Sequence, residues 1–124
     1  NPKVCLSFFW PGMERQIIIK GTAEKIAANL SDGYFESRPR GSQLGALVSD
    51  QSRIIPSREF LENRLKDLEK QYQHKPLERP KYWGGYLVRP FSIEFWQGRP
   101  NRLHDRIRYS LQKDWNWKME RLAP

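Results

Sequence analysis

Runs of β-branched and aromatic residues stand at both ends of the 124-residue chain, and they limit the folds open to it. The first run covers residues 4–10, and the turn-forming pair Pro11 and Gly12 separates it from a second run at residues 15–26. Such runs are typical of strands, and a turn between two of them predicts an antiparallel hairpin. Further runs of this kind begin at residue 84, so the fold is expected to be strand-dominated.

The second strand-forming region contains one long run and a hairpin pattern. Residues 84–98 read as a strand in which Pro90 requires an edge position or a bulge, because proline cannot donate a hydrogen bond to a ladder. Two later segments place apolar side chains at every second position, and they predict a hairpin with its turn near Lys113 and Asp114. The alternating residues are Ile107, Tyr109, Leu111, Trp115, Trp117 and Met119.

Helical patterns fill the middle of the chain. Residues 27–37 and 41–49 predict two short helices separated by Pro39, and residues 57–73 predict a third with Ser57 as its N-cap. In that third helix four apolar residues at spacings of four, three and four form one stripe: Leu61, Leu65, Leu68 and Tyr72. A proline-broken loop at residues 73–83 follows. We expect one α+β domain over residues 1–124 with two or three helices.

Charge and composition narrow the class of partner. The chain has 22 Lys and Arg against 14 Asp and Glu, a net charge of +8 that favours anionic ligands. A nucleic-acid-binding module would show a continuous cationic stripe with exposed aromatics, whereas these cations stand in short clusters, so no nucleic-acid partner is expected. No run approaches the about 20 apolar residues of a membrane helix. The single cysteine, Cys5, fits a reducing compartment such as the cytoplasm.

Metal chemistry finds no support in the sequence. The two histidines, His74 and His104, lie far apart and have no cysteine partners at zinc-ligand spacing. We expect no metal site.

The segment "RLHDR" concentrates cations. If it ends a strand, Arg102, His104 and Arg106 point to one face, where they repel one another unless an anion lies between them. The alternative is a surface ladder of salt bridges with Asp105 and Glu94. The sequence pattern leaves both interpretations open.

Two further segments offer polar groups to a ligand. In "YFESRPRGS" a phenol, a guanidinium and a hydroxyl recur every four residues, at Tyr34, Arg38 and Ser42, and could clamp a phosphate. The alternative is a tyrosine packed in the core and a solvated arginine. In "SDQSR", Gln51 and Ser52 could read the edge of a heterocycle, although a plain polar loop has the same composition.

The stretch "IEFWQGRPNRLHDR" resembles the signature of the pyridoxine (pyridoxamine) 5′-phosphate oxidase family, in which an apolar-Glu-Phe-Trp-Gln block precedes Arg-Leu-His-Asp-Arg. The blocks "RQIIIKGTAEKI", "YFESRPRGSQLGALVSDQS", "PKYWGGYLVRP" and "ERLAP" resemble the same family in its order and spacing. The similarity covers essentially the whole chain. Two segments that family members carry upstream are absent, so we expect a C-terminal portion of the enzyme that lacks its N-terminal strands.

The resemblance implies an FMN-binding split β-barrel that forms a homodimer with FMN at the interface. It implies that Arg102 and His104 are catalytic. The residues it implies for FMN are Gln16, Gln51, Ser52, Trp96 and Arg106. Those it implies for the substrate are Tyr34, Arg38, Ser42, Arg102, Leu103 and His104.

The implied reaction oxidises pyridoxine 5′-phosphate or pyridoxamine 5′-phosphate to pyridoxal 5′-phosphate, with dioxygen as electron acceptor and hydrogen peroxide as product. Two alternatives stay open. One is a non-catalytic split-barrel protein that binds FMN or pyridoxal phosphate, and the other is a related flavin oxidase with a different ring substrate.

Overall fold

The structure, a computed structural model, describes residues 1–124 and consists of two compact units. Unit 1 comprises Asn1–Glu24 and Tyr86–Pro124, and unit 2 comprises Lys25–Gly85. Unit 1 is built on strands and unit 2 on helices. This composition confirms the strand-dominated α+β class with three helices, while the expectation of a single domain over the whole chain stays a prediction.

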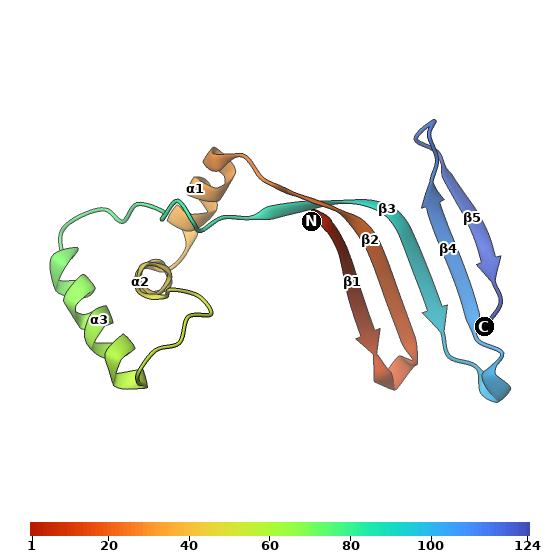
Figure 1. Cartoon of the computed structure of the whole chain (residues 1–124), viewed down its shortest axis with the longest axis horizontal. Helices are drawn as coiled ribbons and strands as arrows, with labels where there is room; N and C mark the ends of the chain where they lie inside the picture. Colours follow the sequence, from red (N-terminus) through yellow and green to blue (C-terminus); the bar gives the residue numbers. More distant parts are fainter. The chain divides into compact units, whose positions relative to one another are not determined.

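Unit 1 contains one five-stranded sheet in the order β1-β2-β3-β4-β5 (Figure 1). Strand β1 pairs antiparallel with β2, β3 with β4, and β4 with β5. Both predicted hairpins are therefore confirmed. The strands are β1 (Lys3–Trp10), β2 (Arg15–Lys25), β3 (Tyr86–Gln97), β4 (Asp105–Leu111) and β5 (Trp117–Leu122).

The turns of these hairpins follow from local backbone chemistry. Pro11 opens the short 3₁₀ helix η1 (Pro11–Met13), and Glu14 leaves it in a left-handed conformation with φ 49°. In the second hairpin Trp115 has φ 65° and lies in the turn, so the predicted alternation is wrong for this residue and begins at Trp117. The backbone N–H of Trp115 donates to the carbonyl of Gln112 at 3.1 Å, which closes that turn.

Pro90 stands in the third of five strands, yet it interrupts no pairing with β4. The ladder between β3 and β4 begins at the pair Ser92 and Ser110, so Pro90 lies beyond its end. The missing N–H of proline is tolerated where no ladder partner is present. The expected edge position is wrong, because β3 is the third of five strands, and the proline is accommodated on the β4 side by the end of the ladder.

Unit 2 contains three helices around a small core. Ser57 caps α3, as predicted, because its Oγ accepts from the backbone N–H of Phe60 at 3.2 Å. Phe35, Leu44 and Leu77 are buried in this core, and the apolar stripe of α3 packs against it through Leu65, Leu68 and Tyr72. The helices are α1 (Ala28–Ser37), α2 (Arg40–Val48) and α3 (Arg58–Gln71). No helix combines the length and apolar character needed to cross a membrane.

The sheet of unit 1 keeps much of its apolar surface exposed. All four buried apolar side chains of the chain, Phe35, Leu44, Val48 and Leu77, belong to unit 2. On the sheet, by contrast, Phe9 is 57% exposed and Met119 is 62% exposed. Apolar faces of this kind are typical of surfaces that bind a partner or a ligand.

The pairing of β2 with β3 depends on a close backbone approach at Gly21. A Cβ added there would lie 2.7 Å from the carbonyl oxygen of Arg89 and 2.7 Å from Cγ1 of Val88. Gly21→Ala should therefore reduce the free energy of unfolding by about 1–3 kcal/mol, because backbone atoms cannot move aside cheaply. Chemical denaturation measures this change. Gly12→Ala is the matched control, since a Cβ at Gly12 meets nothing within 4 Å, and equal stability of the two variants would contradict the placement of β3.

Candidate functional site

The first candidate site lies in unit 1, where β3 ends and β4 begins. Trp96 of β3 is the direct cross-strand partner of Arg106 of β4, so their side chains share one face of the sheet. The ring of His104 lies 5.0 Å from the ring of Trp96, measured between centroids. Three residues selected from the sequence therefore come together here.

A hollow of about 540 Å³ opens beside Trp96. It is lined by aromatic residues from both halves of the sheet, including Trp10, Phe95 and Trp96, and by the side chain of Gln16. The side-chain amide of Gln16 is held by a hydrogen bond of 3.2 Å to Oγ of Ser7. This size and this mixture of flat apolar walls with a few polar groups are typical of sites for small organic ligands and cofactors.

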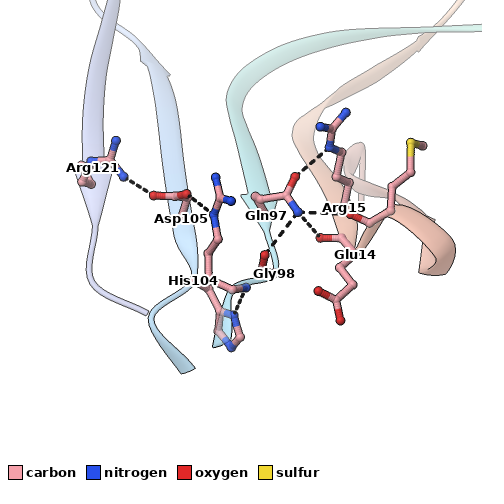
Figure 2. A network of polar contacts seen from close by, with 9 residues as sticks. Glu14, Arg15, Gln97, Gly98, His104, Asp105 and Arg121 are labelled. Carbon is pink, nitrogen blue, oxygen red and sulfur yellow. Dashed lines mark hydrogen bonds and ion pairs between the residues drawn. The ribbon is translucent and has the colours of Figure 1, made fainter. Parts of the chain in front are cut away.

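Gln97 joins the two halves of the sheet at the rim of the hollow (Figure 2). Its Nε2 donates to the carbonyls of Met13 at 3.1 Å and Gly98 at 3.2 Å, and its Oε1 accepts from Nε of Arg15 at 2.7 Å. The backbone N–H of Gly98 also donates to the carbonyl of Glu14 at 2.7 Å. These bonds fix the β1–β2 turn against the end of β3.

A second network holds His104. The backbone N–H of Arg99 donates to Nδ1 of His104 at 3.1 Å, which leaves Nε2 as the ring nitrogen that carries the hydrogen in the neutral side chain. Asp105 accepts from Arg99 at 2.9 Å and from Arg121 of β5 at 2.6 Å, and Figure 2 shows Asp105 and Arg121 facing each other across the two strands. Both guanidinium groups lower the pKa of the Asp105 carboxyl by hydrogen bonding.

The strand interpretation of "RLHDR" is wrong for its first three residues. Pro100 begins a 3₁₀ turn, η2 (Pro100–Arg102), in which Asn101 and Arg102 have φ of 57° and 63°, and β4 starts only at Asp105. A left-handed turn ends the side-chain alternation of a strand. Arg102, His104 and Arg106 therefore do not occupy alternate positions of one strand, and Arg102 and Leu103 are exposed on the loop.

Arg106 is already partly paired within the chain. Its Nε donates to Glu94 at 2.8 Å and its Nη1 to the carbonyl of Ala123 at 2.9 Å. The hydrogen bond and the charge of Glu94 raise the pKa of Arg106 above its usual value. The salt-bridge interpretation thus holds for Arg106 and Glu94, whereas Asp105 pairs with Arg99 and Arg121.

The second candidate site lies in unit 2, where α1 ends and α2 begins. Tyr34 stacks on Trp83 with ring centroids 6.0 Å apart, and the guanidinium carbon of Arg38 lies 5.0 Å from the centroid of the same ring. Nη1 of Arg38 is buried and has no hydrogen-bond partner in the chain. Ser42 is half-buried in the first turn of α2. A buried cationic donor without an acceptor is costly unless a ligand supplies one, so this group suits an anion.

Gln51 and Ser52 form no such arrangement. Both are exposed in a turn between α2 and α3, and Ser52 has φ 66°. Nearby, Asp50 pairs with Arg64 of α3 at 3.1 Å, which ties the turn to that helix. These two residues belong to unit 2 and Gln16, Trp96 and Arg106 to unit 1, and the role of all five at FMN stays a prediction.

The structure adds residues that the sequence patterns did not single out. Trp83 contacts Tyr34 and Arg38, Arg99 binds His104, and Gln97 lines the hollow with Gln16 and Trp96, although none of the three was proposed as a site residue. All three stand inside blocks that carry the family resemblance, which is the sequence signal that could have found them. The partners of Trp83 and Gln97 lie far away in sequence, so spacing could not reveal those contacts.

Comparisons with known proteins bear on the family of the chain. The family profile described as "Pyridoxamine 5'-phosphate oxidase" matches residues 1–72, and the one described as "Pyridoxine 5'-phosphate oxidase C-terminal dimerisation region" matches residues 83–124. A pyridoxine/pyridoxamine 5′-phosphate oxidase of Flavobacterium psychrophilum is 67% identical over 124 residues, which are 100% of this chain and 58% of that protein. The chain therefore spans less than two thirds of that relative's length.

Two solved structures resemble the fold. PhzG of Burkholderia lata, crystallised with tetrahydrophenazine-1-carboxylic acid, superimposes with a TM-score of 0.87 at 27% identity, over 100% of this chain and 60% of that one. A pyridoxamine 5′-phosphate oxidase-related, FMN-binding protein of Nostoc punctiforme gives a TM-score of 0.64 at 13% identity, over 100% of this chain and 64% of that one, which shows the fold alone.

The five antiparallel strands, the three helices and these superpositions define a split β-barrel protein. Within that class, the profile over residues 1–72 and the 67% identity decide the family. The chain belongs to the pyridoxamine 5′-phosphate oxidase family.

The depressed pKa of Asp105 predicts a pH signature for the network around His104. A carboxyl whose pKa is lower in the folded state adds stability above its unfolded pKa of about 4, and loses that contribution as the pH falls through the folded pKa. Asp105→Asn should therefore lower the melting temperature at pH 7, and the difference from the parent should shrink below about pH 4. Melting curves from pH 7 to pH 3 measure this. Asp67→Asn, on the exposed face of α3, is the control, and a difference for Asp105→Asn that does not change with pH would contradict the ion pairs.

Proposed function

We propose that this protein contributes to the FMN-dependent oxidation of pyridoxine 5′-phosphate or pyridoxamine 5′-phosphate to pyridoxal 5′-phosphate, with dioxygen as electron acceptor and hydrogen peroxide as product. The observation that carries the proposal is the buried, unpartnered Nη1 of Arg38, whose guanidinium shares the ring of Trp83 with Tyr34. Together with the hydroxyl of Ser42 in the first turn of α2, these donors suit a phosphate ester. The oxidase of Flavobacterium psychrophilum, with 67% identity, supports the same substrate class. A reducing compartment suits the free, exposed Cys5, and we place the reaction in the cytoplasm.

The residues around Trp96 fit FMN. An isoalloxazine ring needs flat apolar contacts and polar groups at its edges, and the hollow of about 540 Å³ offers the indole of Trp96 and the amide of Gln16. Arg106 retains Nη2 for an anionic group, since its other two nitrogens bind Glu94 and Ala123. Gln51 and Ser52 would add neutral hydrogen bonds. When bound, FMN supplies the acceptor for the hydride that leaves the 4′ carbon of the substrate.

The residues of the chain would then bind and orient the substrate. Tyr34, Arg38 and Ser42 hold its phosphate. Arg102, exposed on the η2 turn, and Leu103 close over its ring, and the charge of Arg102 stabilises charge that develops near the 4′ carbon. His104 presents Nε2 to hold or move a proton, because its Nδ1 is engaged by the N–H of Arg99.

A homodimer with FMN at its interface is part of the proposal. The sheet exposes apolar side chains such as Phe9 and Met119, which a second subunit would cover. Residues 83–124, which include β3, β4 and β5, match the profile described as a dimerisation region. We propose no contact with nucleic acid or membrane.

A second candidate function is a flavin oxidase with a different ring substrate. PhzG, crystallised with tetrahydrophenazine-1-carboxylic acid, has the same fold at 27% identity. A tricyclic carboxylic acid has no phosphate ester, so it would leave the clamp of Tyr34, Arg38 and Ser42 without its ligand. A non-catalytic carrier of FMN or pyridoxal phosphate would keep the clamp but show no turnover.

Product analysis of the full-length holoenzyme separates these functions. We expect pyridoxine 5′-phosphate to yield pyridoxal 5′-phosphate and hydrogen peroxide in equal amounts, and unphosphorylated pyridoxine to react far more slowly. Turnover of phenazine precursors in preference to phosphorylated vitamers would favour the second candidate. Binding of FMN without any peroxide would favour a carrier.

Replacing Arg102 and replacing Arg106 should have different effects on FMN affinity and turnover, although both are arginines and lie four residues apart. Arg106→Ala should lower the affinity for FMN and yield partly apo protein whose activity returns at high FMN concentration. Arg102→Ala should keep its flavin and lose turnover that added FMN does not restore, because the lost group acts on the substrate.

The measurement is the oxidase activity of both variants as FMN is titrated into each. Arg108→Ala is a control, since Arg108 lies on the same strand and its Nη2 pairs with Glu120 at 3.1 Å. The same response of Arg102→Ala and Arg106→Ala to FMN would contradict the assignment.

A further inference from the structure

Trp83 contacts both charged and phenolic members of the phosphate clamp. Its ring stacks on Tyr34 with an interplanar angle of 16°, and it lies under the guanidinium of Arg38 at 5.0 Å. Tyr34 and Arg38 are four residues apart at the end of α1, so one indole spans both. The indole is also anchored to the core, because the rings of Phe35 and Trp83 meet edge-on with centroids 5.5 Å apart.

The contact with Trp83 affects which N–H groups of Arg38 are available to a ligand. A guanidinium that lies over an aromatic ring is attracted to the ring face and loses freedom to turn its N–H groups elsewhere. In Arg38 one of these groups, Nη1, is buried and has no acceptor within the chain. An arginine free to move would turn that nitrogen toward a carbonyl or toward water. The contact with Trp83 therefore keeps the donor free for an anion.

The sequence around Trp83 is suited to hold the indole in this place. The backbone N–H of Trp83 donates to the carbonyl of Pro80 at 2.9 Å, and Nη1 of Arg79 donates to the carbonyl of Trp83. Arg79 is itself fixed by an ion pair of 2.6 Å with Asp32 of α1. The following Gly84 allows a close approach, since a Cβ there would lie 3.1 Å from Oγ of Ser31.

From these contacts we infer that Trp83 is a positioning residue that sets the selectivity for a phosphorylated substrate. This inference rests on the proposed function, because it assigns to Trp83 the orientation of the residues that hold the substrate's phosphate. Trp83 acts through Tyr34 and Arg38 and needs no contact with the reacting carbon. Its effect is to orient the phosphate donors before the ligand arrives, which saves the cost of ordering them on binding.

The test is calorimetric titration of the full-length holoenzyme with 4-deoxypyridoxine 5′-phosphate and with 4-deoxypyridoxine, which lack the oxidisable 4′ hydroxyl. In the parent the phosphorylated compound should bind more tightly. Trp83→Leu should weaken its binding about tenfold and leave the unphosphorylated compound within about twofold. Trp83→Phe should lose only about threefold, because a smaller ring still supports the guanidinium. Flavin content should stay that of the parent in both variants.

Tyr82→Phe is the matched control, since Tyr82 is the neighbouring aromatic residue and anchors the same segment through a 3.0 Å hydrogen bond to the carbonyl of Ala46. It should keep the parent's selectivity. Unchanged selectivity in Trp83→Leu, or an equal loss for both compounds, would overturn the inference. If Trp83→Leu does not fold, a Trp83→Phe variant with the parent's selectivity overturns it equally. A parent that does not prefer the phosphorylated compound would instead refute the proposed function.

Discussion

The pairing of β2 with β3 is the constraint on which the candidate site in the sheet depends. These strands are neighbours in the sheet although unit 2, Lys25–Gly85, separates them in sequence. Gly21 permits their close approach, and Gln97 ties the end of β3 to the β1–β2 turn. Gln16 and Trp96 line one hollow only because this long-range pairing exists.

The two candidate sites use different physical means to present a cation. In the sheet near Trp96, Arg106 binds Glu94, while Arg99 and Arg121 share the single carboxylate of Asp105. In unit 2, Arg38 is held by an aromatic ring and keeps a buried donor free. A compensated network gives a rigid wall, whereas an uncompensated donor gives affinity for an anion. On the sheet, Nε of Arg108 is also buried without a hydrogen-bond partner. What supports assigning the phosphate of the substrate to unit 2 is therefore the gathering of Arg38 and Tyr34 on the ring of Trp83.

Local sequence signals predicted most of the secondary structure. The Ser57 cap and the Leu65 and Leu68 stripe identified α3, and the alternation around Tyr109 identified β4, because these signals act within a few residues. The prediction that Arg102 and His104 lie on one face of a strand was wrong, since a left-handed turn at Asn101 ends the strand pattern. Trp83 was not found, because its contacts join residues about 45 positions apart and no periodicity encodes them. The roles of the individual residues at FMN and substrate remain predictions that mutagenesis tests.

The central claim is that a phosphorylated B6 vitamer reduces FMN held by this protein. Its most direct test is the visible absorption spectrum of the full-length holoenzyme under anaerobic conditions. We expect the bands of bound oxidised flavin to bleach when pyridoxine 5′-phosphate is added, and to return when dioxygen is admitted. Flavin bands that persist with saturating pyridoxine 5′-phosphate, or a protein that retains no flavin after reconstitution with FMN, would contradict the claim.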